Sequence, residues 1–266
     1  VVLDIEKFAR IAHRHGVPLI VDNTFPTPIN CRPFEFGADI VVHSTSKYMD
    51  GHASSVGGVI VDSGKFNWDN GKYPELTEPD ESYHGLVYTK AFGNAAYIVK
   101  CRAHLMRDLG AAASPFNAYL LNMGLETLHL RVERHCSNAL AVAQALEANP
   151  GVTWVNYPGL ESSKYYELAQ KYMPAGSCGV IGFAVKGGRE AAEKFMKALK
   201  LAAIVTHVAD ARTSVLHPAN ATHRQLSDRQ MEEAGIPTDL IRFSVGIEYV
   251  GDIIADIEQA LVAAGI

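Results

Sequence analysis

Short, uniformly apolar segments alternate with helical patterns in the first sixty residues of the chain. Apolar residues recur at helical spacing from Asp4 to Ala12, and Gly16 follows as a helix stop. Three apolar runs come next, at 17–21, 39–43 and 57–62. The first is predicted to be a central parallel strand that is buried on both faces. The alternation predicts an α/β sheet, in which ligands bind outside the carboxyl ends of the strands.

The rest of the chain combines a long irregular segment with further helices and strands. Residues 63–90 are rich in Gly, Pro, Asn and aromatic side chains and lack periodicity. Such a segment is either a functional loop or a surface elaboration packed by its own aromatics. Helices are predicted at 91–112, 116–148, 165–172 and 188–199 and from Asp252 onward, and strands at 152–155, 179–185, 204–206 and 241–245. We therefore predict a large α/β domain with a mostly parallel sheet at 1–123 and a smaller α+β domain at 124–266.

Composition and charge restrict the class of partner. The 266 residues are 48% hydrophobic, and the formal net charge of −5 is spread without the long basic runs that nucleic-acid or membrane binding favours. No apolar run approaches the roughly 18–20 residues that cross a bilayer. The four cysteines form no CxxC pair and the histidines no compact ligand pattern, so neither a disulfide framework nor a metal site is expected. A cytoplasmic protein with a small-molecule partner is the simplest interpretation.

Polar side chains follow the first two predicted strands. Asp22 ends the first strand, and Ser44, Ser46 and Lys47 follow the second. A lysine forms an imine with an aldehyde only when it is partly neutral, which a desolvated site near other positive charge favours. Asp22 is suited to keeping a pyridine nitrogen protonated, and the serine hydroxyls can donate to a phosphate. The four residues suggest a pyridoxal phosphate site, while a helix cap at Asp22 and a simple turn at Ser44–Ser46 are the ordinary alternatives.

Three segments together resemble the Cys/Met-metabolism enzymes of pyridoxal phosphate fold type I. They are residues 20–25, 41–48 and 240–248. The resemblance implies pyridoxal 5'-phosphate as cofactor and Lys47 as the lysine that forms the Schiff base with it. It also implies that Asp22 pairs with the pyridinium nitrogen and that Ser44 and Ser46 bind the phosphate.

The resemblance extends to residues that would bind the substrate. It implies that Arg242 receives the substrate carboxylate, for which a bidentate guanidinium is well suited. His207 stands where the relatives usually carry Asn or Ser, and Ala209 where they usually carry Gly. His207 is expected either to take over the contact with the carboxylate or to mark a changed substrate preference.

Two further segments, 64–85 and 127–135, are similar to those of the O-acetylhomoserine sulfhydrylases within this family. This shifts the interpretation of the irregular segment toward function or assembly. The implied reaction is γ-replacement, in which O-acetyl-L-homoserine and sulfide, or methanethiol, give homocysteine, or methionine, and acetate. γ-Elimination, as in methionine γ-lyase, would use the same residues, and a non-catalytic scaffold is a third alternative. A homotetramer built from dimers is the implied assembly.

The chain begins without Met, directly before a helical pattern. We therefore expect it to be a piece of a longer enzyme. In the family, the residues before the position of Val1 supply a glycine-containing phosphate loop, an aromatic ring that stacks on the cofactor, and a Tyr and an Arg that reach the neighbouring subunit. A chain without them is expected to hold the cofactor poorly.

Overall fold

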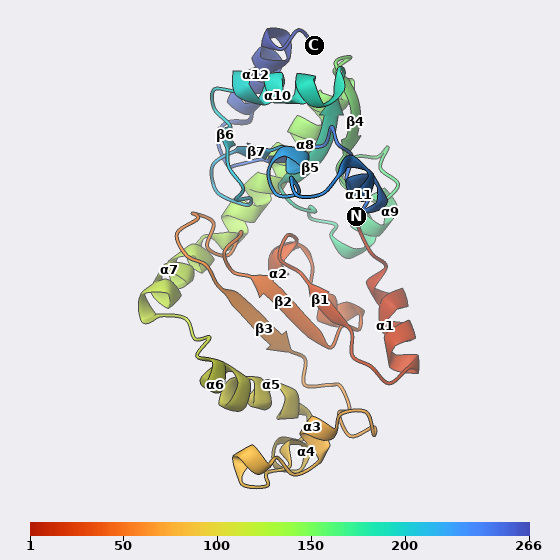
Figure 1. Ribbon diagram of the computed structural model, residues 1–266, viewed down its shortest axis with the longest axis vertical. Coiled ribbons are helices and arrows are strands. Elements are labelled where there is room, and N and C mark those ends of the chain that lie inside the picture. The colour runs from red at the N-terminus through yellow and green to blue at the C-terminus, as the bar shows by residue number, and fades with distance from the viewer.

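A computed structural model describes residues 1–266, with two separate β-sheets (Figure 1). The first sheet has the order β1-β2-β3, and the second has the order β4-β5-β8-β7-β6. The strands of the first sheet are β1 (Ile20–Asp22), β2 (Ile40–Ser44) and β3 (Gly58–Asp62). The strands of the second sheet are β4 (Val152–Asn156), β5 (Val180–Val185), β6 (Ala203–Ile204), β7 (Ser214–Leu216) and β8 (Ile241–Ser244). The α/β class agrees with the prediction, and the sheets are mixed rather than purely parallel.

The first sheet carries the parallel pair that the alternation of helix and strand predicted. β1 pairs in parallel with β2, placing Asp22 opposite Val42, whereas β3 runs antiparallel to β2. The prediction that β1 is a central strand buried on both faces is wrong, because β1 is an edge strand and Ile20 is 51% exposed. The buried central strand is β2, where Ile40 and Val41 are enclosed. An apolar run indicates a strand but does not identify its neighbours.

The predicted first helix is present as α1 (Ile5–Arg14). The carboxylate of Asp4 accepts a hydrogen bond from the Lys7 amide at 3.2 Å, which satisfies one of the free amides of the first turn. Gly16 has φ +62°, the left-handed conformation in which glycine commonly terminates a helix. α1 therefore begins and ends where the sequence indicated.

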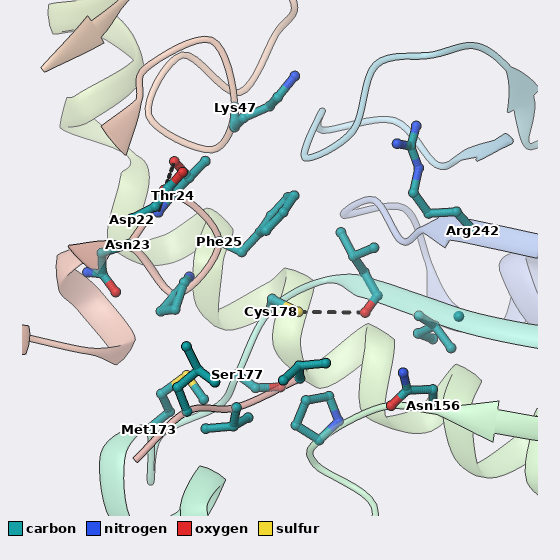
Figure 2. Close-up of a pocket in the computed structure, with 18 of the residues that line it drawn as sticks. Asp22, Asn23, Thr24, Phe25, Lys47, Asn156, Met173, Ser177, Cys178 and Arg242 are labelled. Carbon is teal, nitrogen blue, oxygen red and sulfur yellow. Dashed lines mark hydrogen bonds between the residues drawn. The ribbon is translucent and has the colours of Figure 1, made fainter. Parts of the chain in front are cut away.

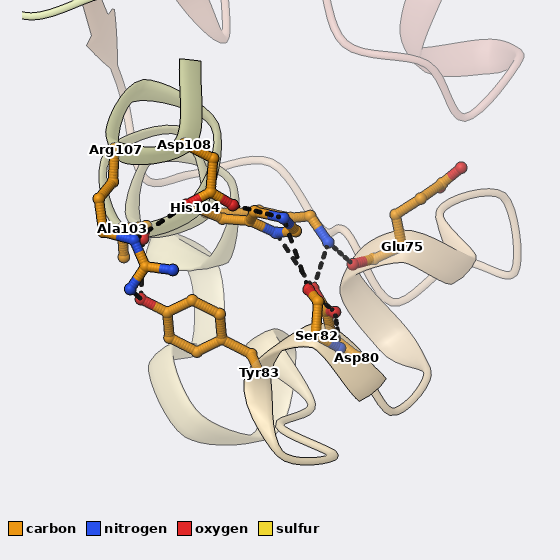
Figure 3. A network of polar contacts seen from close by, with 9 residues as sticks. Glu75, Asp80, Ser82, Tyr83, Ala103, His104, Arg107 and Asp108 are labelled. Carbon is orange, nitrogen blue, oxygen red and sulfur yellow. Dashed lines mark hydrogen bonds and ion pairs between the residues drawn. The ribbon is translucent and has the colours of Figure 1, made fainter. Parts of the chain in front are cut away.

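The irregular segment 63–90 packs against β2 and the helix that follows it, and shares a small apolar core with Ile40 and Ala96. It contains α3 (Pro74–Thr77), a short 3-10 helix at Glu81–Tyr83 and α4 (Tyr88–Phe92). Its aromatic side chains pack together, and Trp68 stacks on Tyr97 with 5.1 Å between ring centroids. Figure 3 shows polar contacts between this segment and the helix that follows, where the Tyr83 hydroxyl donates to the Ala103 carbonyl at 2.8 Å. In addition, Lys100 Nζ lies 2.9 Å from Asp80 Oδ2.

That helix consists of three consecutive pieces, α5 (Ala96–Lys100), a π-helical stretch at Cys101–Met106 and α6 (Arg107–Leu109). The single helix predicted at 116–148 is wrong, because α7 (Pro115–Glu126) and α8 (Leu128–Ala148) are separated at Thr127. Apolar spacing continues across this one-residue interruption, so periodicity alone does not reveal it. The predicted domain boundary near residue 123 falls within α7 and stays a prediction.

The second sheet and its helices enclose the largest core. The remaining helices are α2 (Thr27–Asn30), α9 (Tyr166–Tyr172), α10 (Gly188–Ala198), α11 (Asp228–Glu233) and α12 (Val250–Ala263), with short 3-10 helices at Pro33–Phe36, Gly93–Ala95 and Pro218–Asn220. Phe183 of β5 lies at its centre, edge-on to Phe195 of α10 at 5.8 Å. β7 and α11 are too short to show a periodicity, and the sequence did not indicate them. None of the helices combines the length and apolar character needed to cross a bilayer.

Candidate active site

A cavity of about 750 Å³ lies between the two sheets, beyond the carboxyl ends of β1 and β2 (Figure 2). The first sheet contributes Asp22 and the adjoining turn that carries Lys47, and the second contributes Arg242 from β8. Figure 2 shows Asp22 and Lys47 on one side of the cavity and Arg242 across from them. The site therefore forms only when residues more than 200 positions apart in the sequence are brought together.

Asp22 is held at the end of β1 by Thr24. The amide and hydroxyl of Thr24 donate to Asp22 Oδ1 at 2.9 and 2.6 Å. The same hydroxyl accepts from the Ser44 amide at 2.8 Å, so Thr24 also joins the ends of β1 and β2. No hydrogen bond within the chain involves Asp22 Oδ2, which leaves that oxygen available in the cavity.

Lys47 lies in the tight turn that follows β2. The turn is closed by hydrogen bonds from the Asp50 amide to the Thr45 carbonyl at 2.9 Å and from the Gly51 amide to the Lys47 carbonyl at 2.7 Å. The side chain is half-buried, and burial together with the positive charge of Arg242 lowers the pKa of Lys47 below its ordinary value. Both causes favour the neutral amine, which is the form that adds to an aldehyde.

The two serines that precede Lys47 are placed differently. Ser44 lines the cavity. The Ser46 hydroxyl faces Gly57 instead, accepting from its amide at 3.0 Å and donating to its carbonyl at 3.4 Å. In this arrangement Ser46 joins the Lys47 turn to the start of β3, and its predicted role in phosphate binding stays a prediction.

Arg242 is positioned by β8 and by the segment that ends at Thr206. Its Nη2 donates to the Thr206 carbonyl at 2.7 Å, whereas Nε is buried without a partner. Burial lowers the pKa of Arg242, although an arginine remains charged under any ordinary condition. A buried N–H group without an acceptor is costly, so an anionic ligand in the cavity would be stabilised here.

His207 follows Thr206 directly but does not line the cavity. Its Nε2 is buried without a hydrogen bond, and burial and the nearby Lys47 charge lower its pKa. The imidazole is therefore neutral at physiological pH. Ala209 has φ +64°, a left-handed conformation that favours glycine.

The residues that line the cavity fit a ligand such as pyridoxal phosphate. A lysine with a lowered pKa, a free carboxylate oxygen and an arginine with an unsatisfied N–H converge on it, and no ion pair joins any two of these groups. Sequence reasoning missed several other lining residues, among them Thr24, Asn156, Met173 and Cys178. For Thr24 a signal existed, since an Asp side chain commonly accepts a hydrogen bond from the backbone amide two residues later. The others lie in loops or strand ends without any local pattern.

Comparison with known proteins identifies the family. The sequence model of the Cys/Met metabolism PLP-dependent enzymes matches residues 1–262. The chain belongs to this family. Its predicted family and cofactor, pyridoxal 5'-phosphate, are thereby confirmed.

The chain is 51% identical over 264 residues to a homocysteine synthase of Schizosaccharomyces pombe, covering 98% of this chain and 62% of that protein. It is 47% identical to an O-acetyl-L-homoserine sulfhydrylase of Leptospira meyeri, covering 97% of this chain and 61% of that one. A crystal structure of a Campylobacter jejuni protein, described as an O-acetylhomoserine (thiol)-lyase with a pyridoxyl-lysine-phosphate residue, superposes with a TM-score of 0.93 and 37% identity. That match covers 98% of this chain and 63% of the other. The predicted fold type is confirmed, and the chain spans less than two thirds of the length of these relatives.

Proposed function

We propose that this chain is the part of a pyridoxal phosphate enzyme that carries the reactive lysine, and that the enzyme performs γ-replacement on O-acetyl-L-homoserine. Sulfide replaces acetate, and the products are homocysteine and acetate. The observation that carries the proposal is the convergence of Lys47, Asp22 and Arg242 on one cavity. The names of the relatives, which include homocysteine synthases and O-acetyl-L-homoserine sulfhydrylases, support this substrate class.

Three residues of the chain would hold the cofactor. Lys47 provides the amine, Asp22 the carboxylate that keeps the ring nitrogen protonated, and Ser44, with Ser46 as a further candidate, a hydroxyl for the phosphate. When bound, pyridoxal phosphate supplies an electron sink for the carbons next to the substrate amine. Thr24 holds Asp22 in the orientation this requires, by the two hydrogen bonds that it donates to Oδ1.

Lys47 would also handle protons during the reaction. Released by the incoming substrate amine, it removes the proton from the α-carbon and returns protons at neighbouring carbons as acetate departs and sulfide adds. Because burial and the charge of Arg242 lower its pKa, a larger fraction of Lys47 is unprotonated, and this is the form that acts as a base. One side chain would thus perform both tasks.

Arg242 would orient the substrate through its carboxylate. The unsatisfied Nε and the neighbouring guanidinium nitrogens offer the two parallel donors that a carboxylate accepts. Neutral His207, with an unpartnered Nε2 and close enough to Lys47 to be affected by its charge, would tune the polarity beside the lysine or contribute to carboxylate binding. For the intact enzyme we further propose a homotetramer, use of methanethiol as an alternative to sulfide, and a cytoplasmic location.

The test compares Lys47→Ala with Lys65→Ala, a control at an exposed lysine, in the intact enzyme. Lys47→Ala should lower turnover by at least about a thousandfold and abolish trapping of the cofactor on the protein by borohydride, whereas Lys65→Ala should change neither. Wild-type turnover by Lys47→Ala would contradict the proposal.

A second measurement separates replacement from elimination. O-Acetylhomoserine is supplied with and without sulfide, and homocysteine and 2-oxobutyrate are both quantified. Replacement predicts homocysteine that depends on sulfide. Formation of 2-oxobutyrate as the main product in the presence of sulfide would instead establish γ-elimination, and absence of both products, with no trapped cofactor, would indicate a non-catalytic scaffold.

A further inference from the structure

The four residues after Lys47 are held by groups from the second half of the chain. The Tyr48 carbonyl accepts from Arg131 Nη1 at 2.7 Å, and the Gly51 carbonyl accepts from the Ala211 amide at 2.8 Å. The Tyr48 hydroxyl accepts from the Gly179 amide at 2.7 Å. The orientation of the Lys47 turn is therefore determined by tertiary contacts as well as by its own hydrogen bonds.

Arg131 makes the most extensive of these contacts. Arg131 is 5% exposed. Its guanidinium donates through three nitrogens: Nη1 to Tyr48 O, Nη2 to Gly124 O at 2.5 Å and Nε to Thr127 Oγ1 at 3.1 Å. Gly124 and Thr127 lie at the junction of α7 and α8, so one side chain joins that junction to the Lys47 turn. No carboxylate forms an ion pair with Arg131 within 4.0 Å, although Asp50 lies near enough to oppose the lowering of its pKa by burial.

The surrounding backbone is shaped to admit this guanidinium. A Cβ at Gly51 would collide with Arg131 Nη1, and Gly51 has φ +71°, which itself favours glycine. A Cβ at Gly124 would lie 2.6 Å from the Asp50 carbonyl oxygen. Two glycines from distant parts of the chain thus leave room for the contact between the turn and α7–α8.

The charge of Arg131 is not used in an ion pair, and its burial is unfavourable. Burying a cation costs free energy that its hydrogen bonds must offset, and a structural brace alone could be built from apolar side chains at lower cost. What the guanidinium supplies is a planar set of donors with fixed angles, which sets the position of three acceptors relative to one another. The acceptor next to Lys47 is the one whose position affects the chemistry.

We propose that Arg131 is a positioning residue for Lys47: by holding the Tyr48 carbonyl against the α7–α8 junction, it keeps the lysine amine in its half-buried place facing Arg242. The inference rests on the proposed function, because Lys47 must be the reactive lysine for its position to matter to turnover. A lysine in place of Arg131 would keep the charge, but its single nitrogen cannot bridge the same three acceptors. Even this charge-preserving replacement should therefore loosen the turn that carries Lys47.

The test uses Arg131→Lys and Arg131→Met in the intact enzyme, with Arg134→Met as a matched control on the exposed face of the same helix. Three quantities are measured: hydrogen exchange of the peptide covering residues 47–52, the pH midpoint for borohydride trapping of pyridoxal phosphate on Lys47, and kcat and KM for O-acetylhomoserine. Both Arg131 variants should exchange at least about tenfold faster in that peptide and trap with a higher pH midpoint, because a loosened lysine is better hydrated. kcat should fall about 10- to 100-fold while KM changes less than threefold, since Arg242 is intact.

Several outcomes would overturn the inference. Folded Arg131→Lys with wild-type exchange, pH midpoint and kcat would show that Arg131 only stabilises the fold, even if the melting temperature falls. If Arg131→Met does not fold, Arg131→Lys decides alone, and equal changes in Arg134→Met would also refute a specific role. Failure of the proposed function is distinguishable: it is shown by a wild-type enzyme that is not trapped at Lys47, whereas the exchange measurement still tests the brace.

Discussion

Replacing Thr24 with valine should destabilise the protein although the two side chains have nearly the same shape. The Thr24 hydroxyl makes two hydrogen bonds, to Asp22 Oδ1 at 2.6 Å and from the Ser44 amide at 2.8 Å. Asp22 is exposed to the cavity, so water can replace the first bond and its loss costs little. The Ser44 amide is partly buried at the end of β2, and leaving it without an acceptor costs about 1–2 kcal/mol.

The expected loss for Thr24→Val is therefore about 2 kcal/mol of unfolding free energy. For a chain of this size that corresponds to a decrease of roughly 4–8 °C in melting temperature. Thr24→Ser is the matched control, because it keeps the hydroxyl and loses only a methyl group, worth about 0.8 kcal/mol. Thermal unfolding followed by circular dichroism measures both variants, and a Thr24→Val protein as stable as Thr24→Ser would refute the argument. Cofactor binding should weaken in the same order, since Asp22 loses the hydroxyl that orients it.

Two further predictions concern buried positions near the site. Ala209 is fully buried and has φ +64°. In urea unfolding, Ala209→Val should therefore lower the unfolding free energy by more than about 2 kcal/mol, whereas Ala209→Gly should stay within about 1 kcal/mol of wild type. Equal stability of the two variants would contradict the argument from backbone strain. Burial lowers the pKa of His135 to about 4, and its Nδ1 lies 2.7 Å from the Val245 carbonyl. In the unfolded state the pKa of His135 is near 6.5, so between pH 6.5 and 4 the unfolded state binds more protons than the folded state. The unfolding free energy should therefore decrease by about 3 kcal/mol as the pH is lowered from about 6.5 to 4. His135→Gln should remove this part of the pH dependence, and an unchanged slope would show that His135 does not cause it.

The candidate site shows which of its residues can be identified from the local sequence pattern and which cannot. Asp22 and Lys47 could be identified because each directly follows a short apolar run, and a run of that kind predicts a strand whose end faces a ligand. Thr24 could have been included by its spacing from Asp22. Ser46 could not be placed, because whether a hydroxyl in a turn faces a ligand or a backbone group depends on the neighbouring chain, here on Gly57, which directly precedes β3.

The sequence by itself determined the family, the cofactor class and most of the helices and strands, and it singled out Lys47 as the candidate reactive lysine, because these depend on spacing, on turn residues and on short motifs. Only the tertiary structure decided that β1 is an edge strand, that a single residue separates α7 from α8, and that Arg131, Gly51 and Gly124 meet at the turn after Lys47. These are contacts between segments up to 83 residues apart. No local pattern encodes which distant backbone carbonyl a buried guanidinium will reach, so the chemistry of Lys47 could be predicted from its motif, whereas the groups that hold it in place could not.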